Sequence, residues 1–174
     1  MIETAILCEG DWDDDTDWDE LARKAATAAI KQTPHGDLVA DPVSVEISVK
    51  FATDAEVRKL NTAYRDKDNP TNVLSFPMVQ PDMLGGLANS DDGEVLLGDI
   101  VLADGVCAAE AAEKSIPVRN HAAHLIVHGT LHLLGYDHEQ GEAEAEAMEA
   151  MERAALASLG IGDPYMPAET ADEV

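Results

Sequence analysis

Short stretches of alternating or continuous hydrophobic residues in the first part of the chain predict four strands. Strict alternation from Val43 to Val49 is typical of a strand with one buried face, and Ile2 to Leu7 alternates enough to form another. Asn72 to Phe76 is bracketed by two prolines, which are confined mainly to sheet edges, so we expect an edge strand there. Val95 to Ala103 is almost continuously apolar, which is typical of a central strand.

Helical periodicity, together with residues that begin and end helices, predicts five helices: Trp18 to Lys31, Asp54 to Ala63, Asp104 to Lys114, Val118 to Leu134, and Glu142 to Leu159. Thr53 and Glu56 have the spacing of a capping box at the start of the second helix. On the last helix we expect a buried stripe made of Met148, Met151, Ala155, Leu156 and Leu159. The order of elements indicates an α+β fold in which helices pack on a small mixed four-stranded sheet.

Length and composition indicate one domain, at residues 1–160, followed by an acidic C-terminal tail at 161–174. With 174 residues, 45% of them hydrophobic, the chain is long enough for a substantial core. The N-terminus does not resemble a secretory signal, and nowhere do 18 apolar residues follow one another, so we expect no membrane association. Cys8 and Cys107 lie far apart in the sequence, without a CxxC motif. We therefore expect both to be buried free thiols of a protein in the reducing cytoplasm.

The net charge of −24 argues against general affinity for nucleic acid, because binding to phosphates depends on Lys and Arg. Acidic residues are concentrated in residues 9–20 and 139–174. Five of the eleven basic residues, in contrast, fall within one stretch: Lys50, Arg58, Lys59, Arg65 and Lys67. A polyanion would have to approach this stretch, so Lys50, Arg58, Lys59 and Lys67 are candidates for contact with one.

Three histidines near the end of the fourth predicted helix have a spacing suited to one divalent metal ion. His128 and His132 are four residues apart, so their side chains lie on one face of the helix. Gly135 can end that helix in a left-handed conformation, after which the chain can return and offer His138. Three protein ligands that leave a fourth position for water are typical of catalytic zinc, although imidazole also suits nickel and copper.

Other polar residues lie near this motif, and the sequence leaves their roles open. His121 and His124 fall on the same side of the helix as His128 and His132, where they either support the ligands or are polar residues of the same cleft. Asp137 could orient His138 or accept a proton. Asp99, within the apolar run of the central strand, is either bonded to nearby backbone or takes part in catalysis.

A metal ion held by neutral imidazoles lowers the pKa of bound water to about 7, which makes hydrolysis the expected reaction class. The spacing is comparable with that of HExxHxxGxxH zinc peptidases, but Gly129 occupies the position of their general base, which makes peptide hydrolysis less favoured. A phosphodiester instead needs neutralisation of charge on its oxygens. Arg65 could supply this with its planar guanidinium, or it could be an ordinary surface arginine.

Three separated segments of the chain resemble the YbeY family of bacterial endoribonucleases, also called rRNA maturation factors. They are LNTAYRDKDNPTNVLSFP at 60–77, LGDIV at 97–101 and HGTLHLLGYDH at 128–138, within a similarity over about residues 45–160. The resemblance implies a zinc-dependent endoribonuclease, specific for single strands, that matures the 3′ end of 16S rRNA in the small ribosomal subunit and takes part in late ribosome quality control. It also implies that one Zn²⁺ is held by His128, His132 and His138, and that Arg65 is functionally important.

We expect the acidic segments to lie outside the family's core and RNA to be delivered in a ribosomal context. The contact face would be the Lys50 to Lys67 stretch, with Lys50, Arg58, Lys59 and Lys67 as the residues that contact RNA. Two alternatives remain open at this point. One is a zincin-like metallopeptidase or related hydrolase, and the other is a non-catalytic ribosome assembly factor whose metal stabilises the fold.

Overall fold

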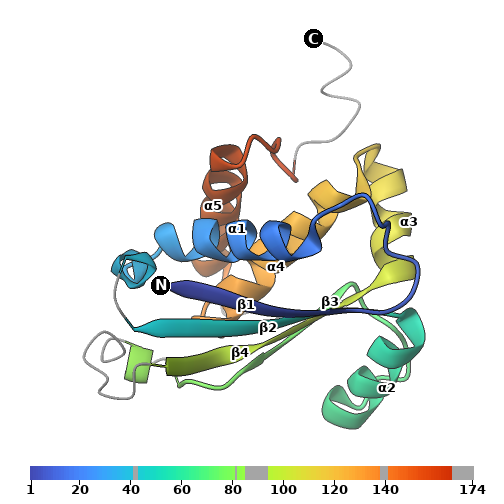
Figure 1. Cartoon of the computed structure of the whole chain (residues 1–174), viewed down its shortest axis with the longest axis horizontal. Helices are drawn as coiled ribbons and strands as arrows, with labels where there is room; N and C mark the ends of the chain where they lie inside the picture. The colour runs from blue at the N-terminus through green and yellow to red at the C-terminus, as the bar shows by residue number, and fades with distance from the viewer. Residues whose placement is uncertain (41–42, 81, 85–93, 138–140, 166–174) are drawn as a thin grey trace.

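A four-stranded mixed sheet lies at the centre of the fold, with the strand order β1-β2-β4-β3 (Figure 1). The computed structural model describes residues 1–40, 43–80, 82–84, 94–137 and 141–165. Strands β1 (Ile2–Cys8), β2 (Ser44–Ala52) and β4 (Glu94–Ala103) run parallel, and β3 (Val73–Pro77) pairs antiparallel with β4 at one edge. The prediction of an edge strand beside an apolar central strand is confirmed.

Five α-helices of the described chain connect and cover these strands: α1 (Trp18–Lys31), α2 (Asp54–Arg65), α3 (Asp104–Lys114), α4 (Val118–Leu133) and α5 (Glu142–Ser158). A short 3₁₀ helix, η1 (Gly36–Val39), lies between α1 and β2. All five predicted helices are confirmed, and two of them, α1 and α3, have the predicted bounds. The α+β architecture is confirmed as well.

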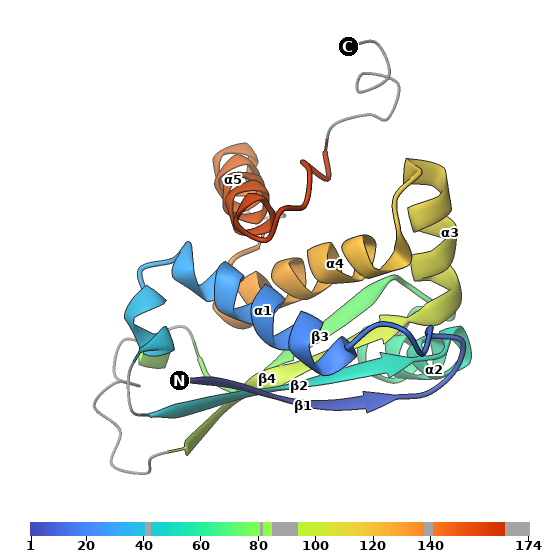
Figure 2. The same ribbon diagram turned by 45° about the horizontal axis from the view of Figure 1, so that its top comes forward.

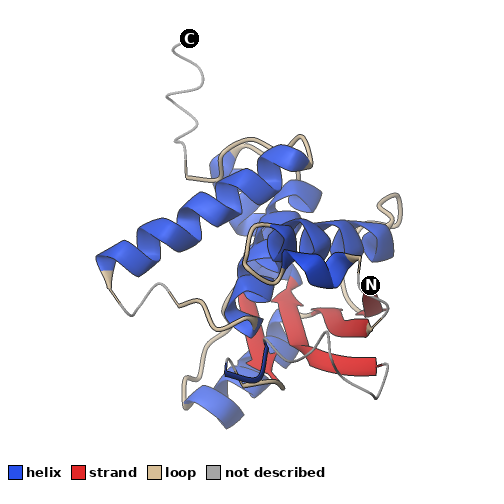
Figure 3. Ribbon diagram, turned by 90° about the vertical axis from the view of Figure 1, so that its left-hand side faces the viewer, coloured by secondary structure: helices blue, strands red, loops and turns tan. Residues whose placement is uncertain are grey.

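Helices α1 and α4 cover one face of the sheet, and α5 packs on α1 and α4 as a further layer (Figures 2 and 3). Most of the core lies under these helices. Helix α2 covers part of the opposite face, where Val57 packs with Leu74 and Val101 in a smaller cluster. Because successive strand residues point to opposite faces, Ile100 belongs to the main core and Val101 to the smaller one.

Helices α2 and α3 begin side by side and cap each other. Asp54, the first residue of α2, accepts a hydrogen bond from the Val106 amide of α3 at 3.1 Å. Asp104, the first residue of α3, accepts from the Gly105 amide at 2.7 Å, from the Asp54 amide at 3.3 Å and, through its other oxygen, from the Asp11 amide at 2.9 Å. Each carboxylate satisfies free N–H groups at a helix N-terminus, which fixes the end of the sheet at which both helices start.

Two tryptophans anchor the acidic segment at residues 9–20. Trp12 and Trp18 are buried and pack edge-to-face at 5.3 Å, and both contact the ring of Phe51 in β2. The indole N–H groups donate to the carbonyl oxygens of Ala52 and Asp13, at 3.0 and 2.8 Å. The acidic side chains of this segment are thus carried by a backbone held against the core.

The capping residue of α2 is confirmed, since the Thr53 hydroxyl accepts from the Glu56 amide at 3.2 Å. The Glu56 side chain instead pairs with Lys50 on β2. The expectation of two buried thiols is wrong for Cys8, which is exposed at the end of the edge strand β1, whereas Cys107 is buried. Within the described residues, none of the helices is long and apolar enough to span a membrane.

Candidate metal centre

Helix α4 carries two histidines of the predicted metal site, His128 and His132, and is largely buried. It lies between the sheet, α1, α3 and α5, and eleven of its sixteen residues are buried. His121, His124, His128 and His132 recur every three or four residues, so they line one side of this helix. His121 and His124 are buried, while His128 and His132 are half-buried towards the C-terminal end.

The rings of His128 and His132 meet through their Nε2 atoms, which lie 3.0 Å apart. Zn–N bonds of about 2.05 Å at a tetrahedral angle would place two ligand nitrogens about 3.3 Å apart, so a small movement of either ring would accommodate the ion. The donor atoms and their direction therefore fit a metal ion held by these two imidazoles.

The turn after α4 has the conformation that the sequence predicts. Gly135 has a φ of 94°, which a residue with a Cβ rarely adopts. Its amide donates to the His132 carbonyl and the Tyr136 amide donates to the Leu131 carbonyl, which together form a Schellman motif. The chain then leads through half-buried Asp137 towards His138, which lies outside the described residues. The third predicted ligand, and the role of Asp137, stay predictions. Within the described ranges, no group of three or more His, Cys, Asp or Glu residues is placed to hold a metal.

A buried carboxylate from α5 holds the ring of His128 from the side opposite the predicted metal. Glu152, 1% exposed, accepts hydrogen bonds through Oε1 from His128 Nδ1 at 3.0 Å and from His124 Nε2 at 2.9 Å. Its Oε2 accepts from the Tyr165 hydroxyl at 2.7 Å. With Nδ1 of His128 engaged in this way, Nε2 is the nitrogen left to face His132. His124 therefore shares a carboxylate with one of the predicted ligands.

The charge state of Glu152 follows from these contacts. Burial alone would raise the pKa of Glu152, but the hydrogen bonds from His124 and His128, the charge of His128 and the bond from Tyr165 lower it to about 2. Burial, and then the hydrogen bond to Glu152, raise the pKa of the Tyr165 hydroxyl. At neutral pH Glu152 is therefore an anion with both oxygens engaged, and Tyr165 is a neutral donor.

The first histidine of the row, His121, is part of a separate structural contact. Its Nε2 lies 2.8 Å from Glu110 Oε1 on α3, and the same oxygen accepts a hydrogen bond from Asn72 Nδ2 at 3.0 Å. Burial lowers the pKa of His121, an effect that Glu110 opposes. This contact ties α4 to α3 and to the start of β3, one helical turn away from His124.

Gly129, at the position of the peptidase general base, lies against the sheet. A Cβ built there would lie 3.2 Å from two side-chain atoms of Ile100, which is fully buried. A side chain at this position would therefore point into the core between α4 and the sheet, away from the Nε2 atoms of His128 and His132. Asp99, next to Ile100 on β4, faces the opposite side of the sheet, where it lines a hollow with Ser48 and Lys50.

Arg65 lies apart from the histidines as the last residue of α2, on the exposed side of that helix. Asp66 follows in a left-handed conformation with a φ of 56°, so the chain turns away directly after Arg65. In the part of the chain that the structure describes, no hydrogen bond or ion pair joins Arg65 to a histidine. The geometry thus brings His124, His128 and His132 together on α4, whereas Arg65 lies on α2, which packs on the opposite face of the sheet.

The basic stretch is partly neutralised by the protein itself. Arg58 pairs with Asp68 through Nε and Nη2, at 2.8 and 3.1 Å, and Lys50 pairs with Glu56. Lys59 and Lys67 are exposed and, like Arg65, have no ion-pair partner among the described residues. Three of the five basic residues therefore remain available to a polyanion.

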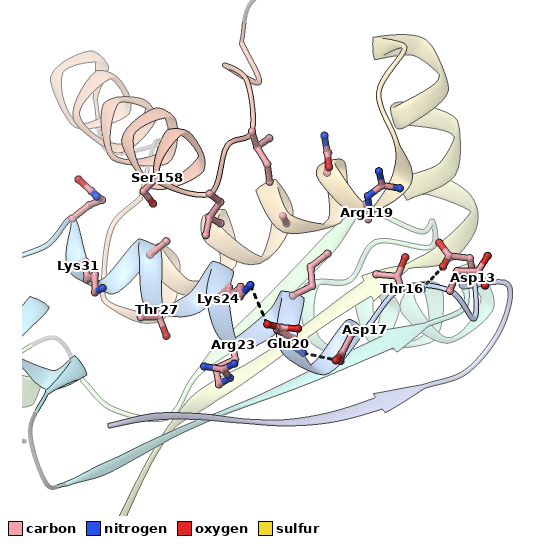
Figure 4. A pocket seen from close by; sticks show the side chains of 18 residues that line it. Asp13, Thr16, Asp17, Glu20, Arg23, Lys24, Thr27, Lys31, Arg119 and Ser158 are labelled. Atoms are coloured by element: carbon pink, nitrogen blue, oxygen red, sulfur yellow. Dashed lines mark hydrogen bonds and ion pairs between the residues drawn. The ribbon is translucent and has the colours of Figure 1, made fainter.

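Two hollows of the surface lie outside the histidine cluster. One, of about 520 Å³, is on the sheet face away from α4 and is lined by Lys50, Tyr64 and Phe76, among others. Tyr64 is 70% exposed, and its ring packs edge-to-face on Phe76 at 5.4 Å. The other, of about 1110 Å³, is a groove over α1 and the start of α4, where Arg23, Lys24 and Arg119 alternate with acidic residues (Figure 4).

Sequence reasoning missed Glu152 and Tyr165. Glu152 lies four residues after Met148, in the middle of the stripe predicted to be apolar, and a lone acid at that position was the available signal. Tyr165 belongs to the segment expected to be an acidic tail. Residues 161–165 of that segment are described, and within them Ile161 packs on the core and Tyr165 binds Glu152.

Comparison with known proteins extends the similarity towards the N-terminus. The sequence profile of a family described as Endoribonuclease YbeY matches residues 9–160. The acidic run at residues 9–20 therefore lies inside the family's domain, and the expectation that it lies outside is wrong.

Individual relatives agree with the family match. An Endoribonuclease YbeY of Rhizorhabdus wittichii is 62% identical over 95% of this chain and 97% of its own length. An Endoribonuclease YbeY of Sphingopyxis alaskensis is 56% identical over 95% of this chain and 98% of its own length. The solution structure of TM1509 from Thermotoga maritima, 24% identical, has the same fold with a TM-score of 0.53 over 95% of this chain and 99% of that one. The resemblance seen in the sequence is confirmed, and the chain belongs to the YbeY family of endoribonucleases.

Proposed function

We propose that this chain is a zinc-dependent endoribonuclease that cuts single-stranded RNA. Its site of action would be the 3′ end of 16S rRNA, in cytoplasmic maturation and late quality control of the small ribosomal subunit. One observation carries the metal dependence: two imidazoles of α4 meet through Nε2 atoms 3.0 Å apart, in a chain that belongs to an endoribonuclease family.

His128 and His132 would hold the ion together with His138. A bound zinc ion supplies a Lewis acid and a water with a lowered pKa, which is what phosphodiester hydrolysis at neutral pH requires. The chain's own contribution is to fix the imidazoles. Helix α4 sets their spacing and the carboxylate of Glu152 fixes the ring of His128. Because Gly129 faces the sheet, the helix has no general base of the peptidase kind, which supports a nuclease over a peptidase.

Arg65 is proposed to bind the phosphodiester and to stabilise the charge that develops on its non-bridging oxygens. Its guanidinium is exposed and can offer two parallel N–H groups to phosphate. Lys59 and Lys67 lie on the same helix and the turn after it, where they could contact neighbouring phosphates. Lys50 and Arg58 would have to leave Glu56 and Asp68 before they could do the same.

Three available cations cannot provide strong binding to RNA on a chain with a net charge of −24. If about three phosphates are neutralised, the logarithm of the association constant should fall with the logarithm of salt concentration with a slope of only about −2. We therefore propose that the RNA is presented within the ribosomal small subunit, with the Lys50 to Lys67 stretch as the contact face and Lys59, Arg65 and Lys67 as its available cations.

The test is cleavage of a labelled single-stranded RNA by zinc-loaded protein, with and without chelator, beside a panel of peptides. We expect RNA cleavage that chelator abolishes and zinc restores, no peptide cleavage, and strong loss of RNA cleavage in His132→Ala and Arg65→Ala. Arg23→Ala, an exposed arginine on α1, is the matched control and should retain activity. Full activity of His132→Ala with a lower melting temperature would contradict the proposal and favour an assembly factor with a structural metal.

The ribosomal context is tested separately by charge reversal. Lys59→Glu combined with Lys67→Glu should weaken both RNA cleavage and association with small subunits, because both residues are exposed and available. Lys24→Glu, on the opposite side of the sheet from α2, is the control. If the double variant cleaved RNA and bound subunits like the wild type, the contact face would be wrong while the metal site could still be right.

A further inference from the structure

Glu152 is the charged side chain that lies deepest in the described structure. It is 1% exposed, on the inner face of α5, between Met148 and Leu156, which are equally buried. A carboxylate enclosed in this way is strongly destabilising unless hydrogen bonds replace its lost water. Among the described residues, its hydrogen bonds come from His124, His128 and Tyr165, so its polar partners belong to the candidate metal centre and to the segment after α5.

The two oxygens of Glu152 have separate partners. Oε1 accepts from His128 Nδ1 and from His124 Nε2, and Oε2 accepts from the Tyr165 hydroxyl. A donor on each oxygen prevents the carboxylate from rotating. Since Glu152 is fixed, the ring of His128 is fixed as well, with its second nitrogen directed at His132 Nε2.

We propose that Glu152 is a positioning residue of the metal centre and that Tyr165 holds it in place. Glu152 keeps Nδ1 of His128 protonated and orients the ring, so that Nε2 presents its lone pair to the ion. This inference rests on the proposed function, in that it requires His128 to be a metal ligand. Residues that orient metal-binding histidines in this manner commonly change metal affinity by 10- to 100-fold when they are replaced.

The segment after α5 is built so that Tyr165 reaches Glu152. The Tyr165 amide donates to Asp163 Oδ1 at 2.8 Å, and Asp163 pairs with Arg153 of α5 at 3.1 Å. The Arg153 guanidinium also lies 5.3 Å from the centre of the Tyr165 ring, and the ring of His124 packs edge-to-face with the Tyr165 ring at 5.5 Å. The residues expected to begin a tail thus close one side of the metal centre.

The experiment compares Glu152→Gln, Glu152→Ala and Tyr165→Phe with wild type and with Glu146→Gln, an exposed glutamate of the same helix. Zinc affinity is measured by competition with a chromophoric chelator, and the visible absorption of the cobalt-substituted protein reports the ligand geometry. Circular dichroism of the metal-free proteins shows that each variant is folded.

We expect about 10-fold weaker zinc binding for Glu152→Gln, which keeps the shape but removes the charge, and about 100-fold weaker binding for Glu152→Ala. Tyr165→Phe should bind zinc several-fold more weakly, with an altered cobalt spectrum, and Glu146→Gln should match wild type. Equal affinities and spectra of wild type, Glu152→Gln and Tyr165→Phe would overturn the inference. If Glu152→Gln does not fold, Tyr165→Phe decides alone. Failure of the wild type to bind one zinc ion would overturn the metal proposal itself.

Discussion

Gly98 is a position at which β4 lies close to the C-terminal end of α4, and its replacement by alanine is a sharp test of the packing described above. A Cβ at this position would lie 2.6 Å from Leu133 Cδ2, 2.6 Å from the Phe76 carbonyl oxygen and 3.2 Å from Pro77 Cα. Leu133 is 1% exposed and directly follows His132. Neither the side chain of Leu133 nor the backbone of β3 can move without disturbing its own packing.

The expected loss of stability follows from these contacts. An extra methyl group in a packed core is destabilising by about 1–3 kcal/mol, and the upper end applies here because two of the three atoms in conflict are backbone atoms. Alanine regains about 0.5–1 kcal/mol, since glycine loses more backbone entropy on folding. The net loss is about 2 kcal/mol, which for a chain of this size lowers Tm by roughly 4–8 °C.

The assay is thermal and urea unfolding followed by circular dichroism, with Gly162→Ala as the matched control. A Cβ at Gly162 has no atom within 4 Å, so that variant should unfold like the wild type. Gly98→Ala should also bind zinc more weakly, because displacement of Leu133 moves the neighbouring His132. If Gly98→Ala were as stable as Gly162→Ala, the close approach of β4 and α4 would be refuted.

Three further outcomes follow from the fold. The free energy of unfolding should fall as pH drops below about 6.5. Burial lowers the pKa of His121 in the folded chain, Lys114 and His124 lower it further and Glu110 opposes them, so the unfolded chain takes up the proton first. Urea unfolding at two pH values should show a smaller loss of stability in His121→Gln than in the wild type. Asp104→Ala should destabilise by about 1–2 kcal/mol in thermal unfolding, because three amides lose their acceptor, and an unchanged Tm would contradict the mutual capping. Trp12→Phe should destabilise by about 1–3 kcal/mol, since the Ala52 carbonyl loses its buried donor; a urea midpoint equal to that of wild type would contradict this.

Local signals in the sequence were sufficient for most secondary structure. The bounds of α1 and α3 were predicted because caps and periodicity act within a few residues. The left-handed Gly135 after α4 was predicted for the same reason. The strand order and the parallel pairing of β1, β2 and β4 could not be predicted in detail, because they depend on contacts between segments far apart in the chain.

The same distinction between local and long-range contacts applies to the candidate site. The meeting of His128 and His132 follows from a spacing of four residues on one helix. The contact between His128 and Glu152 joins residues 24 positions apart on two helices. The sequence around a buried acidic residue does not predict which distant residue will bind it. The ion pair of Arg58 with Asp68 could not be predicted either. The sequence shows a cluster of basic residues, but it does not show which of them form ion pairs with acidic residues of the same chain.

The position of α4 is set from three sides, and these contacts direct the imidazoles of the candidate metal centre. The sheet fixes its depth, because Gly98 and Gly129 allow a distance that side chains would increase. Helix α3 holds the first turn through Glu110 and His121, and α5 holds the third turn through Glu152 and His128. A rotation of α4 by one residue would turn its side chains by 100° and break both contacts at once. The fold itself therefore directs the imidazoles of His128 and His132, so that binding of the proposed ion would require little further ordering of these two rings.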